Sequence, residues 1–211
     1  MHVVDLSHAM HTGMPVYPGD EPVNVRRTHF VNRDGFAQTV VSTNTHAGTH
    51  VDVAAHLHAD APGLDSLGPD NFTGWGAVVD CTDLDSPYID QPRLAHLARV
   101  EALDFVLLMT DWDRHWKTDR YFTDFPTLTD TACRFLGGLD LKGVGLDTPS
   151  PDPVASADLP AHRTLLDHGL VIVENLCNLK GLPDEGFIFS CLPLRIRDAE
   201  ACPVRAVGMT F

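Results

Sequence analysis

The sequence predicts an α/β protein built on a mixed β-sheet. Three observations lead to this prediction. Segments of helical character alternate with strand-like segments through the middle of the chain, strand-like segments dominate both ends, and no repeat, low-complexity tract or charge block divides the 211 residues. We therefore expect one domain over residues 1–211, although the sequence leaves the order of the strands open.

The expected strands are short runs rich in apolar and β-branched residues, bounded by glycine, proline or polar turns. In chain order they are residues 1–6, 36–43, 75–81, 104–110, 144–146, 170–174, 187–192 and 203–211. Prolines and glycines in residues 15–20 and 148–153 predict fixed loops between these strands.

Helices are expected where a capping residue precedes an amphipathic run. Asp90 can cap a helix over about residues 91–102. Thr129 opens a short helix that ends at a glycine pair, and Pro160 begins a helix that Gly169 closes. These helices alternate with the central strands, as the α/β class requires.

Composition excludes several classes of function. The chain has 29 acidic against 15 basic residues and a formal net charge of −14, so it repels nucleic acid and anionic lipid. No apolar run reaches the roughly 18 residues that span a bilayer, and the first residues do not resemble a signal peptide. We expect a cytoplasmic protein with a small-molecule substrate, and no nucleic-acid or membrane partner.

Histidine is the residue that stands out, with 12 copies. Potential metal ligands lie close together at His46, His50, Asp52, His56 and His58. A single strand would spread them over roughly 40 Å, and a single helix would turn Asp52 away from His50. The chain must fold back to gather them, and Gly48 permits this. Imidazole and carboxylate ligands suit zinc, manganese or iron(II).

One loop provides few ligands, so further ligands are expected downstream. His162 lies in the helix that Pro160 begins, and Glu174 ends the strand at residues 170–174. A single histidine or carboxylate in such a position is more often a solvated or hydrogen-bonded residue than a metal ligand. Several of them around one carboxylate indicate a metal site.

Five stretches spread along the chain carry a family resemblance. They are Asp5-Leu6-Ser7-His8, Pro15-Val16-Tyr17-Pro18-Gly19-Asp20, the cluster His46-x-Gly48-Thr49-His50-x-Asp52-x-x-x-His56, Leu146-Asp147-Thr148-Pro149-Ser150, and Pro203-Val204-Arg205-Ala206-Val207. Together they resemble the metal-dependent cyclase-like hydrolase family, which includes bacterial kynurenine formamidase and isatin hydrolase.

The resemblance implies a swivelling β/β/α fold and, as in the formamidases, a site for two zinc ions. On that pattern His46, His50 and Asp52 hold the first ion. Asp52, His162 and Glu174 share or hold the second. His56 matches the catalytic histidine of the family, and Tyr17 matches an aromatic residue that packs against the substrate.

Three departures from the formamidase pattern leave the substrate open. One is that Glu174-Asn175-Leu176-Cys177-Asn178-Leu179 resembles the broader cyclase-like members more than the dedicated formamidases. Tyr17 stands where formamidases usually have tryptophan, and Asp52-Val53-Ala54 replaces their Asp-Ala-Pro. A second aromatic wall is expected from Trp112, in the polar loop after the strand at residues 104–110. Two interpretations of this loop are equally good: it lines a substrate site, or its tryptophans cover the core or a subunit interface. With the resemblance, the loop makes a homodimer or a higher homo-oligomer the expected assembly.

The function expected first is hydrolysis of an amide, formamide, lactam or lactone of a small aromatic or cyclic substrate. One or two divalent ions, Zn²⁺ first and Mn²⁺ second, would activate water, and His56 would move its proton. Two alternatives remain open at this point: a ring-forming cyclase or dehydratase that uses the same metal, and a metal-binding module without catalysis.

Other chemistries lack their sequence signals. The dinucleotide fingerprint fails because Thr148 stands where the third glycine after Gly143 and Gly145 belongs. No Gly-x-Ser-x-Gly nucleophile motif occurs. The five cysteines are scattered without a Cys-x-x-Cys pair, which argues against a disulfide framework or a thiolate zinc site.

Overall fold

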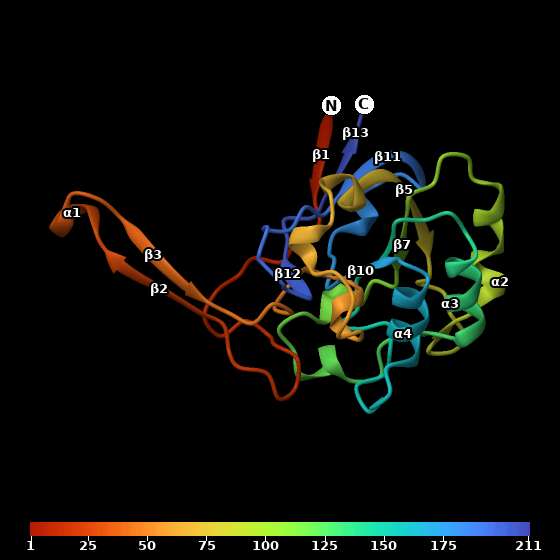
Figure 1. Cartoon of the computed structure of the whole chain (residues 1–211), viewed down its shortest axis with the longest axis horizontal. Helices are drawn as coiled ribbons and strands as arrows, with labels where there is room; N and C mark the ends of the chain where they lie inside the picture. The colour runs from red at the N-terminus through yellow and green to blue at the C-terminus, as the bar shows by residue number, and fades with distance from the viewer.

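A nine-stranded mixed sheet forms the centre of the computed structural model, which describes residues 1–211 (Figure 1). The strand order is β1-β13-β11-β5-β7-β9-β10-β4-β12. The four strands from β5 to β10 are parallel, whereas all pairs outside them are antiparallel. In sheet order the bounds are His2–Asp5, Val207–Thr210, Glu185–Ser190, Thr73–Asp80, Phe105–Met109, Gly143–Leu146, Val171–Glu174, His50–Asp52 and Ala201–Pro203.

Two apolar cores lie on opposite faces of this sheet, because alternate residues of each buried strand point to opposite sides. Val106 and Leu108 of β7 join the core beneath the helices, and Phe105 and Leu107 join the other core. The first core is closed by α2 (Gln91–Leu94), α3 (Asp130–Gly137) and α4 (Pro160–Asp167), which gather on one side of the sheet in Figure 1.

The remaining elements are short. Seven 3₁₀ helices occur: η1 (Ala54–His56), η2 (Leu64–Ser66), η3 (Pro69–Phe72), η4 (Ala95–Arg99), η5 (Trp112–His115), η6 (Asp119–Phe122) and η7 (Leu179–Gly181). A small parallel pair joins β6 (Tyr88–Ile89) to β8 (Thr127–Leu128). No helix in the structure is both long and apolar enough to cross a membrane.

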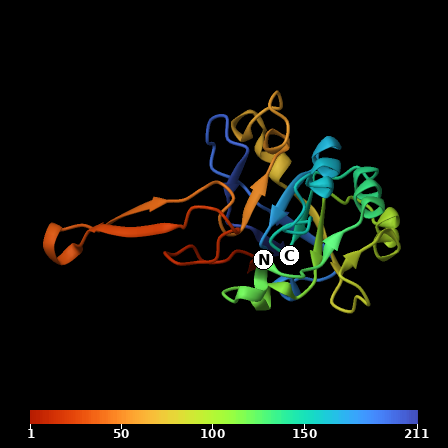
Figure 2. The same cartoon turned by 90° about the horizontal axis from the view of Figure 1, so that it is seen from below.

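A hairpin arm projects from the body, as Figures 1 and 2 both show. It consists of the antiparallel strands β2 (Asn24–His29) and β3 (Gln38–Ser42), with the one-turn helix α1 (Val31–Asp34) at the tip. Every residue of β3 is exposed, and the arm touches the body only near its base, where Val25 of β2 packs on the small cluster of Met14, Val23 and Ala47.

The predicted α/β class and mixed sheet are confirmed, and the expected caps hold. Thr129 caps α3 by accepting a hydrogen bond from the amide of Ala132, and Pro160 is the first residue of α4. The helix expected over residues 91–102 is wrong in extent, because its α-helical part ends at Leu94 and continues as η4 to Arg99. The strand expected over residues 203–211 is wrong in extent: β12 ends at Pro203 on one edge of the sheet, and β13 begins at Val207 and lies second from the other edge, beside β1.

Candidate active site

The register of two antiparallel strands brings the candidate ligands together. On β4, His50 and Asp52 share one face while Val51 points into the apolar core. Glu174, the last residue of β10, lies directly opposite His50. This pairing joins two segments that are more than a hundred positions apart in the sequence, and it fixes an imidazole beside a carboxylate.

A turn before β4 returns the chain to the same place. Gly48 has a φ of +67°, and a Cβ added there would lie 2.9 Å from Cε of Met14. The turn brings His46 back to Asp52, with 2.9 Å between His46 Nδ1 and Asp52 Oδ1. This is the fold-back that the spacing requires, at the residue expected to allow it.

His162 completes the cluster from α4. Its Nε2 atom lies 3.0 Å from Oε1 of Glu174 and 3.8 Å from Oδ2 of Asp52. On the other side of the same carboxylate, Oε2 of Glu174 lies 3.2 Å from Nε2 of His50. The two carboxylates therefore lie among three imidazoles, and both are almost completely buried.

Hydrogen bonds to the far ring nitrogens orient two of these histidines. Nδ1 of His50 donates to the carbonyl of Gly48 at 2.8 Å, and Nδ1 of His162 donates to Asp152 at 2.8 Å. Each ring therefore presents Nε2 to the carboxylates. This is the usual arrangement of metal-binding histidines, whose second nitrogen donates to a carbonyl or carboxylate.

Several buried atoms at the centre have no hydrogen-bond partner. They are Nε2 of His50, both carboxylate oxygens of Asp52, and Oε1 of Glu174. The ion-pair distances above are short, yet these atoms are not aligned for hydrogen bonds. Unpaired buried polar atoms are costly, so a cluster of them indicates a missing partner. A divalent cation would be that partner, and nitrogen and oxygen donors without thiolates fit such an ion.

Two overlapping triads have ligand atoms within 4.8 Å of one another: His46, Asp52 and His56, and His50, Asp52 and Glu174. Asp52 belongs to both triads. The donor set therefore fits one ion or two. His56 lies at ligand distance, which leaves two roles open for it, metal ligand or proton carrier.

The charges of the cluster favour a cation. Burial alone would lower the pKa of His50, but Asp52 and Glu174 outweigh burial and raise it to about 9. For His162, Asp152 and Glu174 likewise overcome burial and raise the pKa to about 10. Without a metal, the buried carboxylates hold protons on these rings. A metal ion would displace those protons.

His56 differs from its neighbours. It ends η1 and is half-buried, with its ring centroid 4.4 Å from that of His46. Burial lowers its pKa, and the carboxylate of Asp52 offsets this only in part. His56 is therefore neutral at pH 7 and free to accept a proton.

A cavity of about 220 Å³ opens above this cluster. Seven of the eight residues expected at the site line it: Tyr17, His46, His50, Asp52, His56, His162 and Glu174. The eighth, Trp112, is buried away from the cavity, where its indole N–H donates to the carbonyl of Tyr121.

Trp116, four residues later, lines the cavity in place of Trp112. Its ring stacks on His8 at 4.0 Å between centroids and meets Tyr121 edge-on at 4.9 Å. Phe122 adds a second wall and meets the ring of Tyr17 edge-on at 6.0 Å. The cavity thus has a polar floor and aromatic walls.

The comparisons agree with this geometry. The family model "Putative cyclase" matches residues 4–153. The chain belongs to this cyclase family. It is 33% identical to the kynurenine formamidase of Salinibacter ruber, over 98% of this chain and 97% of that protein. It is 29% identical to the kynurenine formamidase of Bacillus cereus, over 97% of this chain and 95% of that protein.

Solved structures share the fold of this cyclase-family chain. Isatin hydrolase A from Labrenzia aggregata, bound to benzyl benzoate, superposes with a TM-score of 0.89 at 24% identity, covering 99% of this chain and 93% of that chain. A protein described as a predicted metal-dependent hydrolase, from Bacillus stearothermophilus, gives a TM-score of 0.79 at 25% identity, covering 98% of this chain and 97% of that chain. The fold that the resemblance implied is confirmed.

Sequence reasoning missed two supporting residues of the cyclase-family site. Asp152 accepts backbone hydrogen bonds at the start of α4 as well as the one from His162, but in the sequence it looks like turn chemistry. Asn175 donates to the carbonyl of Gly48 and accepts from the hydroxyl of the buried Tyr121. Its position directly after Glu174 was the available signal.

Proposed function

We propose that this chain hydrolyses an amide, formamide, lactam or lactone bond in a small aromatic or cyclic substrate, using a divalent metal and water. The observation that carries the proposal is the group of unpartnered buried ligand atoms beneath an aromatic-walled cavity. The relatives named kynurenine formamidase and the structural neighbours named isatin hydrolase support the same reaction class.

The ligands proposed for the metal are His46, His50, Asp52, His162 and Glu174. A bound divalent ion, Zn²⁺ first and Mn²⁺ second, would lower the pKa of water and polarise the carbonyl group of the substrate. The related chain described as a metal-dependent hydrolase supports a divalent ion. With Asp52 common to both triads, the site has room for one ion or two.

His56 is proposed as the residue that moves the proton. Because its pKa is lowered, it is neutral at pH 7 and accepts a proton from the attacking water. It then donates that proton to the leaving nitrogen, or to the leaving oxygen of a lactone, as the bond to the acyl carbon breaks. The water oxygen stays on the acyl carbon, so the products are a carboxylate and an amine, or a carboxylate and an alcohol from a lactone.

The aromatic walls bind and orient the ring of the substrate. Tyr17 and Phe122 form one wall, and Trp116 forms another. Trp112 supports this loop from the core through its hydrogen bond to Tyr121. A ring held between these walls places its amide group at the floor and excludes bulk water from it.

Turnover of simple substrates tests this function. Protein loaded with Zn²⁺ or Mn²⁺ is expected to hydrolyse formanilide or to open isatin, to stop when a chelator removes the metal, and to recover when metal returns. A cyclase or a binding module would leave both compounds intact. Failure of the metal-loaded protein on a panel of aryl formamides, lactams and lactones would refute the proposal.

We also propose a homodimer in which the hairpin arm contacts a second copy. The arm is basic, with Arg26, Arg27 and Arg33 against a single acidic residue, whereas the whole chain has a net charge of −14. It also exposes Val31 and Phe36. A basic, apolar arm complements the acidic body of another copy. Light scattering after size exclusion is expected to give twice 23.1 kDa, and a monomeric mass would contradict this.

A further inference from the structure

The charges around the cavity are all of one sign apart from histidine. Of its seventeen lining residues, none is lysine or arginine, and three are carboxylates. Asp52 and Glu174 are buried within the ligand cluster. Asp20 is exposed and lines the cavity, so it lies at the mouth. It is the one carboxylate that a substrate meets outside the proposed metal ligands.

A tight turn fixes Asp20 relative to an aromatic wall. The amide of Asp20 donates to the carbonyl of Tyr17 at 3.0 Å, and Gly19 between them has a φ of +100°. Proline followed by a glycine of positive φ is the pattern of a type II turn. Burial first, and then the charges of Glu174, Asp152 and Asp20, raise the pKa of Tyr17. The turn therefore fixes the backbone of Asp20 next to that of Tyr17, and the Asp20 carboxylate lies close enough for its charge to act on the Tyr17 hydroxyl.

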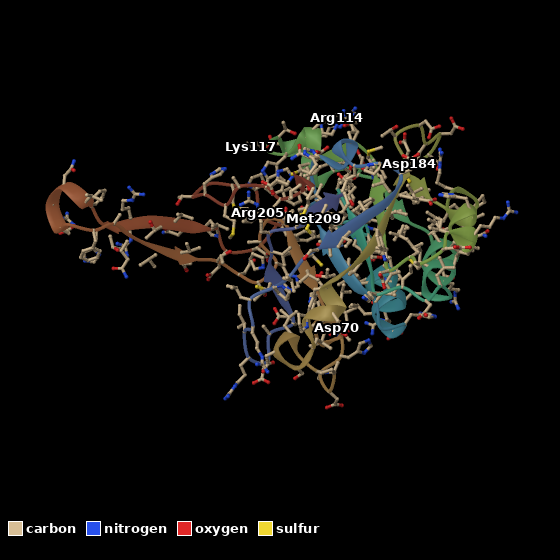
Figure 3. The ribbon with its side chains drawn as sticks, turned by 90° about the horizontal axis from the view of Figure 1, so that it is seen from above. Asp70, Arg114, Lys117, Asp184, Arg205 and Met209 are labelled. Atoms are coloured by element: carbon tan, nitrogen blue, oxygen red, sulfur yellow. The ribbon has the colours of Figure 1, made fainter.

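No basic side chain of the loop that carries Trp116 and Phe122 lines the cavity, and Arg120 in that loop lies over the ring of Trp112 instead. Arg114 and Lys180 both pair with Asp111, at 3.1 Å and 2.6 Å. Lys117 follows Trp116 but does not line the cavity. Arg114 and Lys117 are both labelled in Figure 3, beside the green loop that holds η5. A substrate carboxylate at the mouth would therefore lie near the negative charge of Asp20, with no basic side chain in the cavity lining to pair with it.

We propose that Asp20 selects aromatic amides that carry an ammonium group at the end away from the scissile bond, and disfavours those that carry a carboxylate there. The inference rests on the proposed hydrolase function. A ring held between the aromatic walls with its amide at the ligand cluster directs its far substituent to the mouth. Asp20 attracts an ammonium group there and repels a carboxylate, and the net charge of −14 acts in the same direction.

Three formanilides of matched size test the charge preference, with aminomethyl, hydroxymethyl or carboxylate groups at the meta position. For an exposed charge pair we expect each step of this series to change kcat/KM by about threefold, so that the ammonium compound exceeds the carboxylate by about tenfold. The preference is expected to shrink in high salt, because exposed charges are screened. Calorimetric binding of the three corresponding acetanilides to the metal-free protein measures the same ranking without turnover.

In the variant Asp20→Asn, the ratio of kcat/KM for the ammonium substrate to kcat/KM for the neutral substrate is expected to fall close to one. Glu21→Gln removes the same charge one residue away, from a side chain outside the cavity lining. It is expected to keep the wild-type ratio, as is Lys117→Met. A wild-type preference for the carboxylate compound, or an unchanged ratio in Asp20→Asn, would overturn the proposal. If no formanilide is hydrolysed, the hydrolase function itself fails, and acetanilide binding still decides the role of Asp20.

Discussion

Replacing Glu174 with glutamine removes one negative charge from the ligand cluster and keeps the shape of the side chain. Its two oxygens lie 3.2 Å from Nε2 of His50 and 3.0 Å from Nε2 of His162, and the side chain is almost completely buried. Glu174 and Asp52 are the two carboxylates of the cluster, so the substitution removes half of the negative charge that faces the ion. We expect Zn²⁺ affinity to fall more than tenfold, equal to at least ~1.4 kcal/mol.

Equilibrium dialysis against a competing chelator, followed by elemental analysis, measures this change, and formanilide turnover is expected to fall with it. Glu200→Gln is the matched control. Glu200 lies 3.4 Å from Nε2 of His46, but its side chain is 36% exposed, so its effect is expected to stay below about threefold. Equal metal content and equal rate in Glu174→Gln would exclude Glu174 from the site.

Two further predictions concern supporting residues. Asp152→Asn removes the charge that orients His162, and we expect Zn²⁺ affinity to fall about tenfold in the same dialysis assay; unchanged affinity would contradict that role. Burial lowers the pKa of His8 to about 4, so the unfolded chain binds more protons below pH 6.5 and stability falls on acidification. Between pH 6.5 and 5.0 the free energy of unfolding falls by ~2 kcal/mol because of His8, a figure reduced to about 1 kcal/mol when partial contact of the ring with solvent is allowed for. The variant His8→Phe keeps an aromatic ring beside Trp116. Urea unfolding at pH 7.5 and 5.0 measures how much stability each protein loses on acidification, and we expect His8→Phe to lose about 1 kcal/mol less than wild type. Equal losses in the two proteins would contradict this.

The parts of the fold that sequence predicted well are those with local signals. Thr129 and Pro160 mark helix starts through capping and backbone geometry, which depend on few neighbours. Strand order depends instead on pairings between distant segments, such as β4 with both β10 and β12. Only the second strand of the arm was expected from the sequence, because β2 is only partly covered and lacks the regular alternation that a buried face imposes.

The candidate site follows the same division. The short spacing from His46 to Asp52 required a turn, and Gly48 has the positive φ that makes one. The choice between Trp112 and Trp116 could not be made locally, because His8 stacks on Trp116 from a distant part of the chain. Asp152 was missed because its role appears only when α4 brings His162 beside it.

Parallel measurement of metal content and formanilide turnover in His56→Ala separates proton transfer from metal binding. The proposed roles leave His46, His50, Asp52, His162 and Glu174 to hold the metal, with His56 beside the attacking water. We therefore expect His56→Ala to keep its metal and its fold while turnover falls by about 10²–10⁴-fold, whereas His50→Ala loses metal as well. Loss of metal from His56→Ala would make His56 a ligand, and full activity would contradict the mechanism.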